Sequence, residues 1–346
     1  MIFEAVLRQI EKKLPFVIYQ KPNSSLLIAF LQNNEVLENW KSFSRGFVIQ
    51  PFDEGKTIFF EESNCEIIKE NSAKYLINSI NENEYKTNIK QQSFENLVVK
   101  TKDFLKQNSM DKIVVSTYEE VDILKNKLKI FQKIISKYSH AFCYWFYHPK
   151  VGEWMGATPE LLMQKNNNQI TTVSLAGTQI YQENMIWQEK EKEEQEFVTN
   201  YIQEKLKKYV EKIEIGAINT IKAGKLAHLK TIIQATLIDG SKLFEIVKDL
   251  HPTPAVCGLP KENALSFILK AENYNRAYYT GYLGEWNKDF ENNETEKTQL
   301  FVNLRCMQII KNQARIYVGC GITKDSIPEN EYLEIVNKSK TMRTVL

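Results

Sequence analysis

Two acidic residues in a strongly charged segment lie where a helix would turn them towards the protein interior. The pattern predicts this helix from about residue 187 to residue 210, and its apolar face is marked by Phe197, Val198 and Tyr201. Glu194 precedes these three residues by three, four and seven positions, and Glu191 lies one turn earlier, so both acids share that face. A carboxylate that faces a core is costly unless it is paired or binds a metal ion. Glu194 is therefore a candidate metal ligand, with a rim position in contact with water as the alternative.

A second row of charged residues lies in the segment SIPENEYLEIVNKSK, where the pattern predicts a helix from about residue 328. Ser326 and Glu329 match the S-x-x-E pattern of a capping box. Three further residues follow at i, i+3 and i+7 and line one face of this helix: Glu331, Glu334 and Lys338. By itself this row favours a surface Glu–Lys pair, which contributes roughly 0.2–0.5 kcal/mol.

Arg305 stands among apolar neighbours in the strand-like segment FVNLRCMQII and is one of only six arginines in the chain. A guanidinium in such surroundings is expected to hold a carboxylate in bidentate fashion. That carboxylate could belong to a ligand or to an ion pair within the protein. Gly177 in SLAGT and Gly319 in YVGCG would let a ligand approach the backbone closely, although either could serve a bulge or a turn.

The loop DLHPTPAVCGLP places three prolines within nine positions, beside His251. Proline fixes φ and pushes the preceding residue away from helical conformation, so this loop has a defined shape. It follows SKLFEIVKDL, whose apolar residues recur at i, i+3, i+4 and i+7 and predict an amphipathic helix packed on a core. The loop is therefore held at its base, and a simple helix-stopping linker accounts poorly for three prolines.

The elements that position these residues follow a mixed order. Residues 14–62 read as β-hairpins, a helix is predicted over 119–138, and strands and helices then alternate irregularly to the end of the chain. This order favours an α+β fold with large antiparallel sheets over a wound parallel sheet. We expect a single domain over residues 1–346, with a β-rich N-terminal part, 1–100, and a part that carries the motifs, 101–346.

The composition of the 346 residues is that of a globular protein, with 43% hydrophobic and 25% charged residues. The net charge of +2 and the lack of a basic block with interleaved aromatic residues argue against nucleic-acid binding. Five cysteines without C-x-x-C spacing predict reduced thiols and neither a disulfide nor a zinc framework. No apolar run approaches the roughly 20 residues of a membrane span, and we expect no contact with a membrane and a cytoplasmic location.

Six short motifs, in this order and spacing, resemble those of the chorismate-utilising enzymes: GATPELL, SLAGT, LHPTPAVCGLP, RAYYTGYLG, LRC and GCGI-x3-SIPENEYLE-x3-K. The LHPTPAV form resembles isochorismate synthases in particular. The motifs cover residues 110–340, and the first hundred residues add little beyond RGFVIQPF. The resemblance implies an α/β/β/α sandwich of two orthogonally packed antiparallel sheets, with chorismate as substrate and Mg²⁺ as cofactor.

The resemblance also implies roles for single residues. Lys112 in MDKIVVST matches the base of the family, and Glu160 in GATPE matches its acid. Four acids match the metal site, two as ligands and two as water-mediated partners: Glu194 and Glu334, then Glu191 and Glu331. Further positions match groups that hold the substrate: Gly177, Thr178, His251, Tyr279, Arg305, Gly319 and Lys338. The chain departs from the usual family pattern at three positions that do not carry a reacting group: Thr117, Gln195 and Cys257.

The implied reaction adds water at C2 of chorismate with loss of the C4 hydroxyl. Salicylate, anthranilate and aminodeoxychorismate synthases are the rival interpretations, and a non-catalytic binding subunit is a rival of another class. Aminodeoxychorismate synthases resemble one another in carrying a lysine where this chain has Ala176, which argues against that activity. Lys112 favours water over ammonia as the nucleophile, which argues against an anthranilate synthase. Salicylate synthases tend to have PLAGT where this chain has SLAGT, beginning at Ser174. The pathway, menaquinone or siderophore biosynthesis, stays open, and we expect a monomer.

Overall fold

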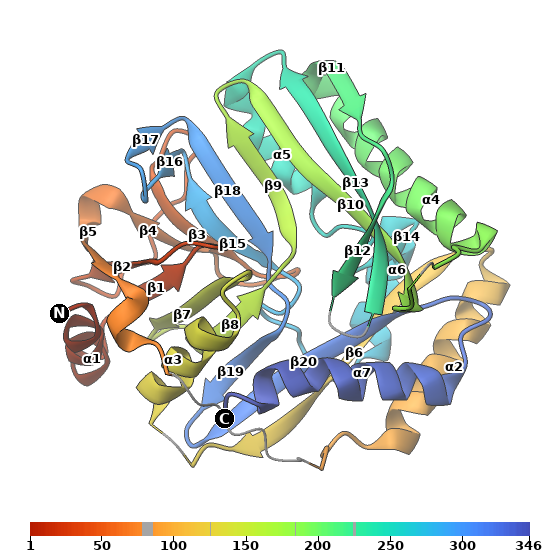
Figure 1. Cartoon of the computed structure of the whole chain (residues 1–346), viewed down its shortest axis with the longest axis horizontal. Coiled ribbons are helices and arrows are strands. Elements are labelled where there is room, and N and C mark those ends of the chain that lie inside the picture. Colours follow the sequence, from red (N-terminus) through yellow and green to blue (C-terminus); the bar gives the residue numbers. More distant parts are fainter. Residues whose placement is uncertain (78–85, 125, 184, 224–225) are drawn as a thin grey trace.

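Two nine-stranded sheets form the centre of the molecule (Figure 1). The computed structural model describes residues 1–77, 86–124, 126–183, 185–223 and 226–346. Sheet A has the strand order β14 (Gly258–Leu259), β6 (Lys112–Asp122), β20 (Gln313–Ile322), β19 (Cys306–Ile310), β8 (Gly152–Thr158), β7 (Phe142–His148), β1 (Phe16–Gln20), β2 (Leu26–Gln32) and β5 (Cys65–Asn71). Every strand pair in the described segments is antiparallel.

Sheet B has the order β11 (Val210–Ile215), β13 (Leu226–Leu237), β10 (Gln169–Ile180), β9 (Leu161–Asn166), β18 (Lys297–Val302), β15 (Tyr282–Trp286), β3 (Gly46–Gln50) and β4 (Ile58–Glu61), with β12 (Asn219–Ala223) also paired to β13. A small hairpin is formed by β16 (Lys288–Asp289) and β17 (Glu294–Thr295). The strands of the β-rich N-terminal part belong to both sheets, since β1 pairs with β7 of sheet A and β3 pairs with β15 of sheet B.

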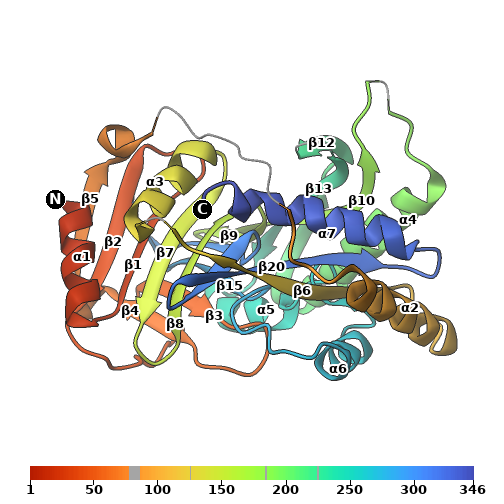
Figure 2. The ribbon, with the colours of Figure 1, turned by 90° about the horizontal axis from the view of Figure 1, so that it is seen from below.

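Helices cover the outer faces of both sheets. Sheet A carries α1 (Ile2–Lys12), α2 (Gln91–Gln107), α3 (Lys127–Lys137), α6 (Lys261–Ala271) and α7 (Pro328–Arg343), and sheet B carries α4 (Glu189–Leu206) and α5 (Leu243–Leu250). Helices α1 and α2 lie at opposite ends of the molecule (Figure 2). Short 3₁₀ helices are Glu62–Asn64, Ser72–Tyr75, Lys207–Tyr209 and Gly240–Lys242. None of the helices in the described ranges is both long and apolar enough to span a membrane.

Three hydrophobic cores separate four layers, which gives the order helix, sheet, sheet, helix. Strand β1 shows how one segment serves two of these cores. Phe16 and Ile18 pack in the core under the helices of sheet A, whereas Val17 and Tyr19 pack between the sheets. Because side chains alternate across a strand, both faces of a central strand must be apolar, and FVIYQ reads as a continuous run. The α+β fold with two large antiparallel sheets is confirmed.

Two sequence predictions about element boundaries are wrong. The helix predicted over 119–138 begins only at Lys127, because residues up to Asp122 continue β6 in register with β20. The predicted capping box of Ser326 and Glu329 does not form, since Ile327 is the N-cap of α7 and Pro328 is its first residue. The Ser326 hydroxyl instead accepts a hydrogen bond from the Thr323 amide at 3.1 Å.

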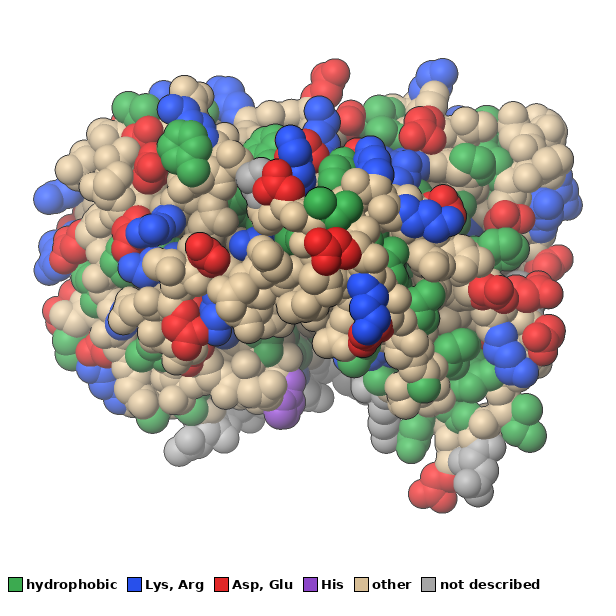
Figure 3. All heavy atoms as spheres, turned by 90° about the horizontal axis from the view of Figure 1, so that it is seen from above, with side chains coloured by type: hydrophobic (Ala, Val, Ile, Leu, Met, Phe, Trp, Pro, Cys, Tyr) green, Lys and Arg blue, Asp and Glu red, His purple; other side chains and the backbone are tan. Residues whose placement is uncertain are grey.

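Charged side chains of both signs are interspersed on the face of the molecule shown in Figure 3. The face contains no large area of a single sign. This distribution agrees with the net charge of +2 and the close balance of 45 basic and 43 acidic residues.

Two of the places where the chain passes from one sheet to the other are adjacent. Strand β8 of sheet A leads into β9 of sheet B, and β18 of sheet B leads into β19 of sheet A. The crossovers run side by side, because β8 pairs with β19 and β9 pairs with β18. Two hydrogen bonds join them: the Val302 amide donates to the Glu160 carbonyl at 2.9 Å, and the Ala157 amide donates to the Arg305 carbonyl at 3.0 Å.

Asn303 fixes the second crossover from inside the protein. It is 1% exposed, its amide nitrogen donates to the Tyr278 carbonyl at 2.8 Å, and its amide oxygen accepts from the Tyr144 hydroxyl. Its backbone exchanges hydrogen bonds with Thr280 and Gly281 at 2.9 and 2.7 Å. The polar atoms of this buried residue therefore hold the crossover against the 278–281 segment.

We predict that Asn303→Ala lowers the free energy of unfolding by about 2–4 kcal/mol, because it leaves the buried Tyr144 hydroxyl and the Tyr278 carbonyl without these partners. Urea unfolding of the two chains measures the difference. Asn200→Ala, at an exposed position of α4, is the control and should change stability by less than about 0.5 kcal/mol. Equal stability of the Asn303 variant and the control would show that the crossover does not depend on this side chain.

Candidate active site

Lys112, the first residue of β6, forms an ion pair with Glu194 of α4. The Lys112 ammonium lies 2.6 Å from Glu194 Oε1, and the two side chains are 16% and 27% exposed. The lysine chain lies across Gly321 of β20, where a Cβ would collide with Lys112 Cε. Glycine at 321 therefore leaves the space through which the predicted base reaches the predicted metal ligand.

Glu160 lies on the crossover between β8 and β9. Its side chain keeps some solvent contact, yet burial by surrounding protein is the largest influence on it and raises its pKa to about 7. The positive charges of Lys112, Arg305 and Lys338 act in the opposite direction without offsetting burial. Glu160 therefore keeps its proton at a higher pH than an ordinary glutamate does, as a general acid requires.

Arg305 lies on the other crossover, and the sequence prediction that it sits within a strand is wrong. β18 ends at Val302, β19 begins at Cys306, and Arg305 has a φ of 48°. Burial lowers the pKa of the guanidinium, while Tyr279, Glu334 and Glu160 oppose this effect. No described residue forms a hydrogen bond or an ion pair with the guanidinium. The described residues thus provide no partner for an internal ion pair of Arg305. The planar guanidinium can instead bind the carboxylate of a ligand through two nitrogens.

Helix α7 brings its charged row to the same place. Lys338 lies 2.6 Å from Glu334 and donates to the Gly319 carbonyl at 2.9 Å. Burial raises the pKa of Glu334, but the charge and hydrogen bond of Lys338 together with the charges of Lys112 and His228 outweigh burial and leave that pKa below its usual value. Burial raises the pKa of Glu331, one turn earlier, and the Glu334 charge adds to that rise.

Tyr279 completes this side of the site. The residue is 4% exposed, and burial raises the pKa of its phenol. Its hydroxyl lies 3.0 Å from the point where a Cβ of Gly319 would stand, and its ring stacks on Tyr317 at 5.4 Å. The absence of a side chain at Gly319 thus leaves room for the tyrosine hydroxyl, whereas the expected approach of a ligand to this backbone stays a prediction.

Strand β10 and helix α4 form the opposite side. Gly177 has a φ of 64°, and a Cβ there would lie 3.1 Å from Glu191 Cβ, so a larger residue would push α4 away. His228 Nδ1 lies 3.3 Å from the Gly177 carbonyl oxygen. Thr178 pairs with His228 in the register of β10 and β13, but the Thr178 side chain lies outside the described part of the chain.

His228 is a site residue that sequence reasoning missed. Burial lowers the pKa of its imidazole, and the charges of Lys338, Glu334 and Arg305 act on it as well. The sequence signal was weak: His228 is one of four histidines and begins the strand-like segment HLKTIIQATL. Only the pairing of β13 with β10 brings it beside the predicted residues.

His251 is not joined to the carboxylates by any contact that the structure describes. Its ring packs against Tyr282 with centroids 4.8 Å apart, and burial together with the Lys261 charge lowers its pKa to about 3. The far end of the proline loop is the part that borders the site, because Leu259 of β14 pairs with Lys112. The predicted substrate contact of His251 stays a prediction.

The buried face of α4 differs from the sequence prediction, because Phe197 is 50% exposed. The buried row consists of Gln195, Val198 and Ile202. The Gln195 side-chain amide donates to the Ser174 carbonyl at 3.0 Å and to the Thr231 hydroxyl at 2.9 Å, which turns the helix towards β10 and β13. Glu194 consequently lies at the margin of the helix that faces Lys112.

A buried ion pair that sequence reasoning also missed supports β6 beneath Lys112. Arg276 and Glu272 have 2% and 1% exposed side chains and are bonded through two nitrogens and both carboxylate oxygens. Arg276 also donates to the Val114 carbonyl at 2.7 Å and the Val256 carbonyl at 2.9 Å, and Glu272 accepts from the Ser116 amide at 2.7 Å. One pair thus ties β6 to the proline loop.

The residues present fit a magnesium ion. In the described ranges no group of three or more His, Cys, Asp or Glu side chains is close enough to hold a metal. Mg²⁺ commonly uses only one or two protein carboxylates and keeps several waters, so such a group is not required. Glu194 and Glu334 are each paired with a lysine that a cation could replace, and Glu191 Oε2 is buried without a hydrogen-bond partner in the described structure.

Known proteins of one family are similar to this chain. The family model described as "Chorismate binding enzyme" matches residues 26–346. The vibriobactin-specific isochorismate synthase of Vibrio cholerae is 30% identical over 200 residues, which are 54% of this chain and 49% of that protein. Isochorismate synthase MenF of Escherichia coli is 27% identical over 252 residues, 69% of this chain and 57% of that protein. The matched region thus spans about half the length of these relatives.

Solved structures share the fold along nearly the whole chain. The structure of DhbC from Bacillus anthracis covers 98% of both chains with a TM-score of 0.78 at 22% identity. The structure of MenF from Escherichia coli covers 96% of this chain and 88% of that chain with a TM-score of 0.77 at 19% identity. At such identities the likeness establishes the architecture.

We predict that Arg276→Met lowers the free energy of unfolding by about 3–5 kcal/mol, because it leaves the Glu272 carboxylate buried without its partner. Arg315→Met is a matched control, since Arg315 pairs with Glu120 on the same strand β6 but with side chains that are 27% and 42% exposed. The control should lose no more than about 1–2 kcal/mol. Equal losses in chemical denaturation would contradict the supporting role of the buried pair.

Proposed function

The chain belongs to the chorismate-binding enzymes, and we propose that it is an isochorismate synthase, which converts chorismate into isochorismate. The observation that carries the proposal is the environment of Glu160. Its pKa of about 7 supplies a proton donor at neutral pH, and Lys112 and Arg305 lie close enough to act on its charge. An acid, a candidate base and a carboxylate receptor therefore surround one place.

The proposed reaction exchanges one hydroxyl for another on the same ring. Lys112 acts as the base only after its ion pair with Glu194 separates and the ammonium has released its proton to solvent; the neutral amine then takes a proton from the water that adds at C2. Glu160 donates its proton to the hydroxyl that leaves C4, and the amount of protonated acid limits this step near its pKa. Arg305 binds a substrate carboxylate through its fork, and Lys338 adds positive charge beside it.

Magnesium is part of the proposal. Glu194 and Glu334 would hold the ion, with Glu191 and Glu331 beside them on the same two helices. When bound, Mg²⁺ supplies positive charge to a substrate carboxylate. Glu334 is suited to this role because its cationic neighbours, Lys338 first among them, together outweigh burial and keep the pKa of this carboxyl below its usual value.

Ala176 supports the choice of water as nucleophile. This residue is 5% exposed in β10, where aminodeoxychorismate synthases resemble one another in carrying a lysine. An alanine offers no amine that could attack the ring. A menaquinone or siderophore pathway, a cytoplasmic location and a monomeric state stay predictions for this chain.

The decisive experiment identifies the product of chorismate and Mg²⁺ by chromatography. We expect isochorismate to accumulate in a mixture with chorismate, because neither side of the exchange gains much. Lys112→Ala should abolish turnover without unfolding the protein, whereas Lys100→Ala on the exposed face of α2 should not. Pyruvate formed in step with chorismate loss, detected with lactate dehydrogenase, would favour a salicylate synthase instead. Anthranilate formed with added ammonia would favour an anthranilate synthase.

The pH dependence follows from the acid. Since Glu160 must carry a proton, we predict that kcat falls as the pH rises through about 7. Glu160→Gln should lower kcat by about 100-fold or more, because an amide cannot donate this proton. Glu196→Gln, at an exposed position of α4, is the control and should keep both the rate and the profile. A wild-type rate that stays constant from pH 6 to pH 9 would contradict the role of Glu160.

Metal dependence tests the carboxylates. We predict that a chelator abolishes turnover and that Glu194→Ala raises the Mg²⁺ concentration for half-maximal rate by about tenfold or more, since a hard oxygen ligand is lost. Excess Mg²⁺ should restore part of the rate. Glu193→Ala, the exposed neighbour on α4, removes the same charge without this effect. Undiminished turnover in the chelator would refute the magnesium site.

A further inference from the structure

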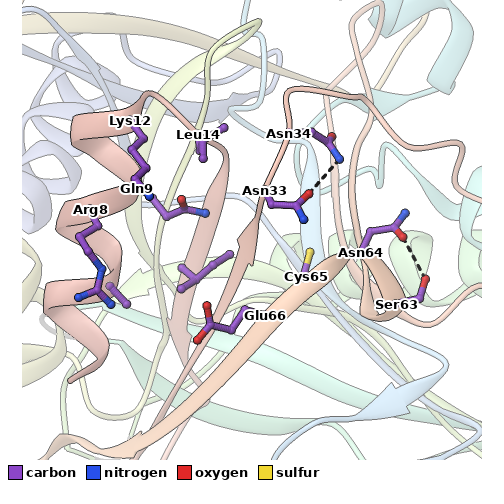
Figure 4. Close-up of a pocket in the computed structure, with 12 residues that line it drawn as sticks. Arg8, Gln9, Lys12, Leu14, Asn33, Asn34, Ser63, Asn64, Cys65 and Glu66 are labelled. Carbon is purple, nitrogen blue, oxygen red and sulfur yellow. Dashed lines mark hydrogen bonds between the residues drawn. The ribbon is translucent and has the colours of Figure 1, made fainter.

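A concave site lies at the edge of sheet A that is far from the candidate active site. Lys112 is on β6, near one edge of this sheet, and β2 and β5 form the opposite edge. A pocket of about 540 Å³ opens there between α1, the end of β2 and the start of β5 (Figure 4). Apart from a few apolar side chains, its lining is charged or polar and includes Arg8, Gln9, Lys12, Asn33, Asn64 and Glu66.

The pocket presents two cations on one side. Arg8 and Lys12 are four residues apart in α1 and so project from neighbouring positions on the helix surface. No described residue forms a hydrogen bond or an ion pair with either side chain. One carboxylate, that of Glu66, also lines the pocket. The excess of positive charge favours a ligand with an anionic group, and the guanidinium can bind a carboxylate in bidentate fashion.

Gln9 supplies a fixed acceptor at the base of the pocket. The residue is 8% exposed, and its side-chain amide donates to the Gln32 carbonyl at 2.8 Å and to the Pro15 carbonyl at 3.2 Å. Because both partners are carbonyl groups, the nitrogen must point towards them, and the orientation of the amide is determined. No described residue donates to Gln9 Oε1. Figure 4 shows this side chain extending from α1 towards Asn33, which follows the end of β2.

The opposite wall is held in place by its own hydrogen bonds. Gln32 is 1% exposed, and its amide donates to Asn34 Oδ1 at 2.9 Å and to the Val36 carbonyl at 2.7 Å. Asn34 in turn donates to Asn33 Oδ1 at 3.1 Å, which leaves the Asn33 amide nitrogen directed away from that bond. The polar groups of the wall are therefore organised before any ligand arrives, which lowers the entropy cost of binding.

We propose that this pocket binds a small carboxylate that also carries a hydroxyl group. Arg8 and Lys12 hold the carboxylate, Gln9 Oε1 accepts a hydrogen bond from the hydroxyl, and the asparagine amides contribute further polar contacts. The bound molecule does not react, because the acid and base of the candidate active site lie on the other side of the sheet. The inference is independent of the proposed reaction.

Isothermal titration calorimetry of the whole chain with L-malate tests the proposal, with succinate as the matched probe that lacks the hydroxyl. Malate should bind at one site, and succinate should bind at least about fivefold more weakly because Gln9 Oε1 then has no donor. The double variant Arg8→Gln, Lys12→Gln should weaken malate binding by at least about tenfold. Both side chains are exposed, so the variant should fold, which thermal unfolding verifies.

Lys100→Gln with Lys106→Gln is the control for charge, since both lysines are exposed on α2 and the net change is the same. This control should bind malate as the unchanged protein does. Equal affinity of the two double variants would overturn the proposal, as would equal binding of succinate and malate, which indicates charge attraction alone. Loss of malate binding in Arg305→Gln would place malate in the candidate active site and would also overturn the proposal.

Discussion

The chain passes between the two sheets at two adjacent crossovers, from β8 to β9 and from β18 to β19. The arrangement of the candidate active site depends on the position of these crossovers. Each crossover interrupts a strand at the seam between the sheets, where backbone must leave one hydrogen-bonding ladder and enter another. Glu160 occupies one interruption and Arg305 the other. A side chain there need not alternate with its neighbours across a sheet, so it can point into the site. The positive φ of Arg305 is an unfavourable backbone conformation that this geometry requires. The hydrogen bonds of Asn303 with Tyr144, Tyr278, Thr280 and Gly281 stabilise the same crossover.

Two buried ion pairs connect β6 to the elements packed against it. Arg276 and Glu272 bind the strand to the proline loop, and Arg343 of α7 binds Glu119 of the same strand with side chains 5% and 0% exposed. Such pairs lose much hydration energy on burial, so they add little net stability compared with an apolar core. Their geometry is nevertheless strict, because a planar guanidinium accepts only a few orientations of its partner. They fix where β6 and α7 meet.

The site contains two kinds of carboxylate, those paired with a lysine and one without a close cation among the described residues. Glu194 and Glu334 each face a lysine at 2.6 Å, and the pKa of Glu334 lies below its usual value for this reason. Glu160 forms no such close pair, and burial raises its pKa to about 7. The pKa of the same chemical group is therefore raised in one environment and lowered in another, because burial dominates at Glu160 whereas the cationic neighbours together outweigh burial at Glu334.

The sequence by itself determined the local periodicities and the inventory of reacting groups. The apolar spacing in α5 predicted its buried residues correctly, and the two acids of α4 lie beside the site even though Phe197 does not mark its buried face. The motifs singled out Lys112 and Glu160 and the paired charges of α7, which the structure places near one another, because their signal is a residue type at a short, fixed spacing.

Only the tertiary structure decided how distant segments meet. Lys112 and Glu194 are 82 residues apart, and Arg276 binds a carbonyl 162 residues away. The assignment of β1 to sheet A and of β3 to sheet B, and the place of His228 beside Gly177, depend on such pairings as well. Hydrophobic periodicity records the direction of a side chain within one or two turns of its own element, whereas the identity of the partner is set by packing across the whole chain.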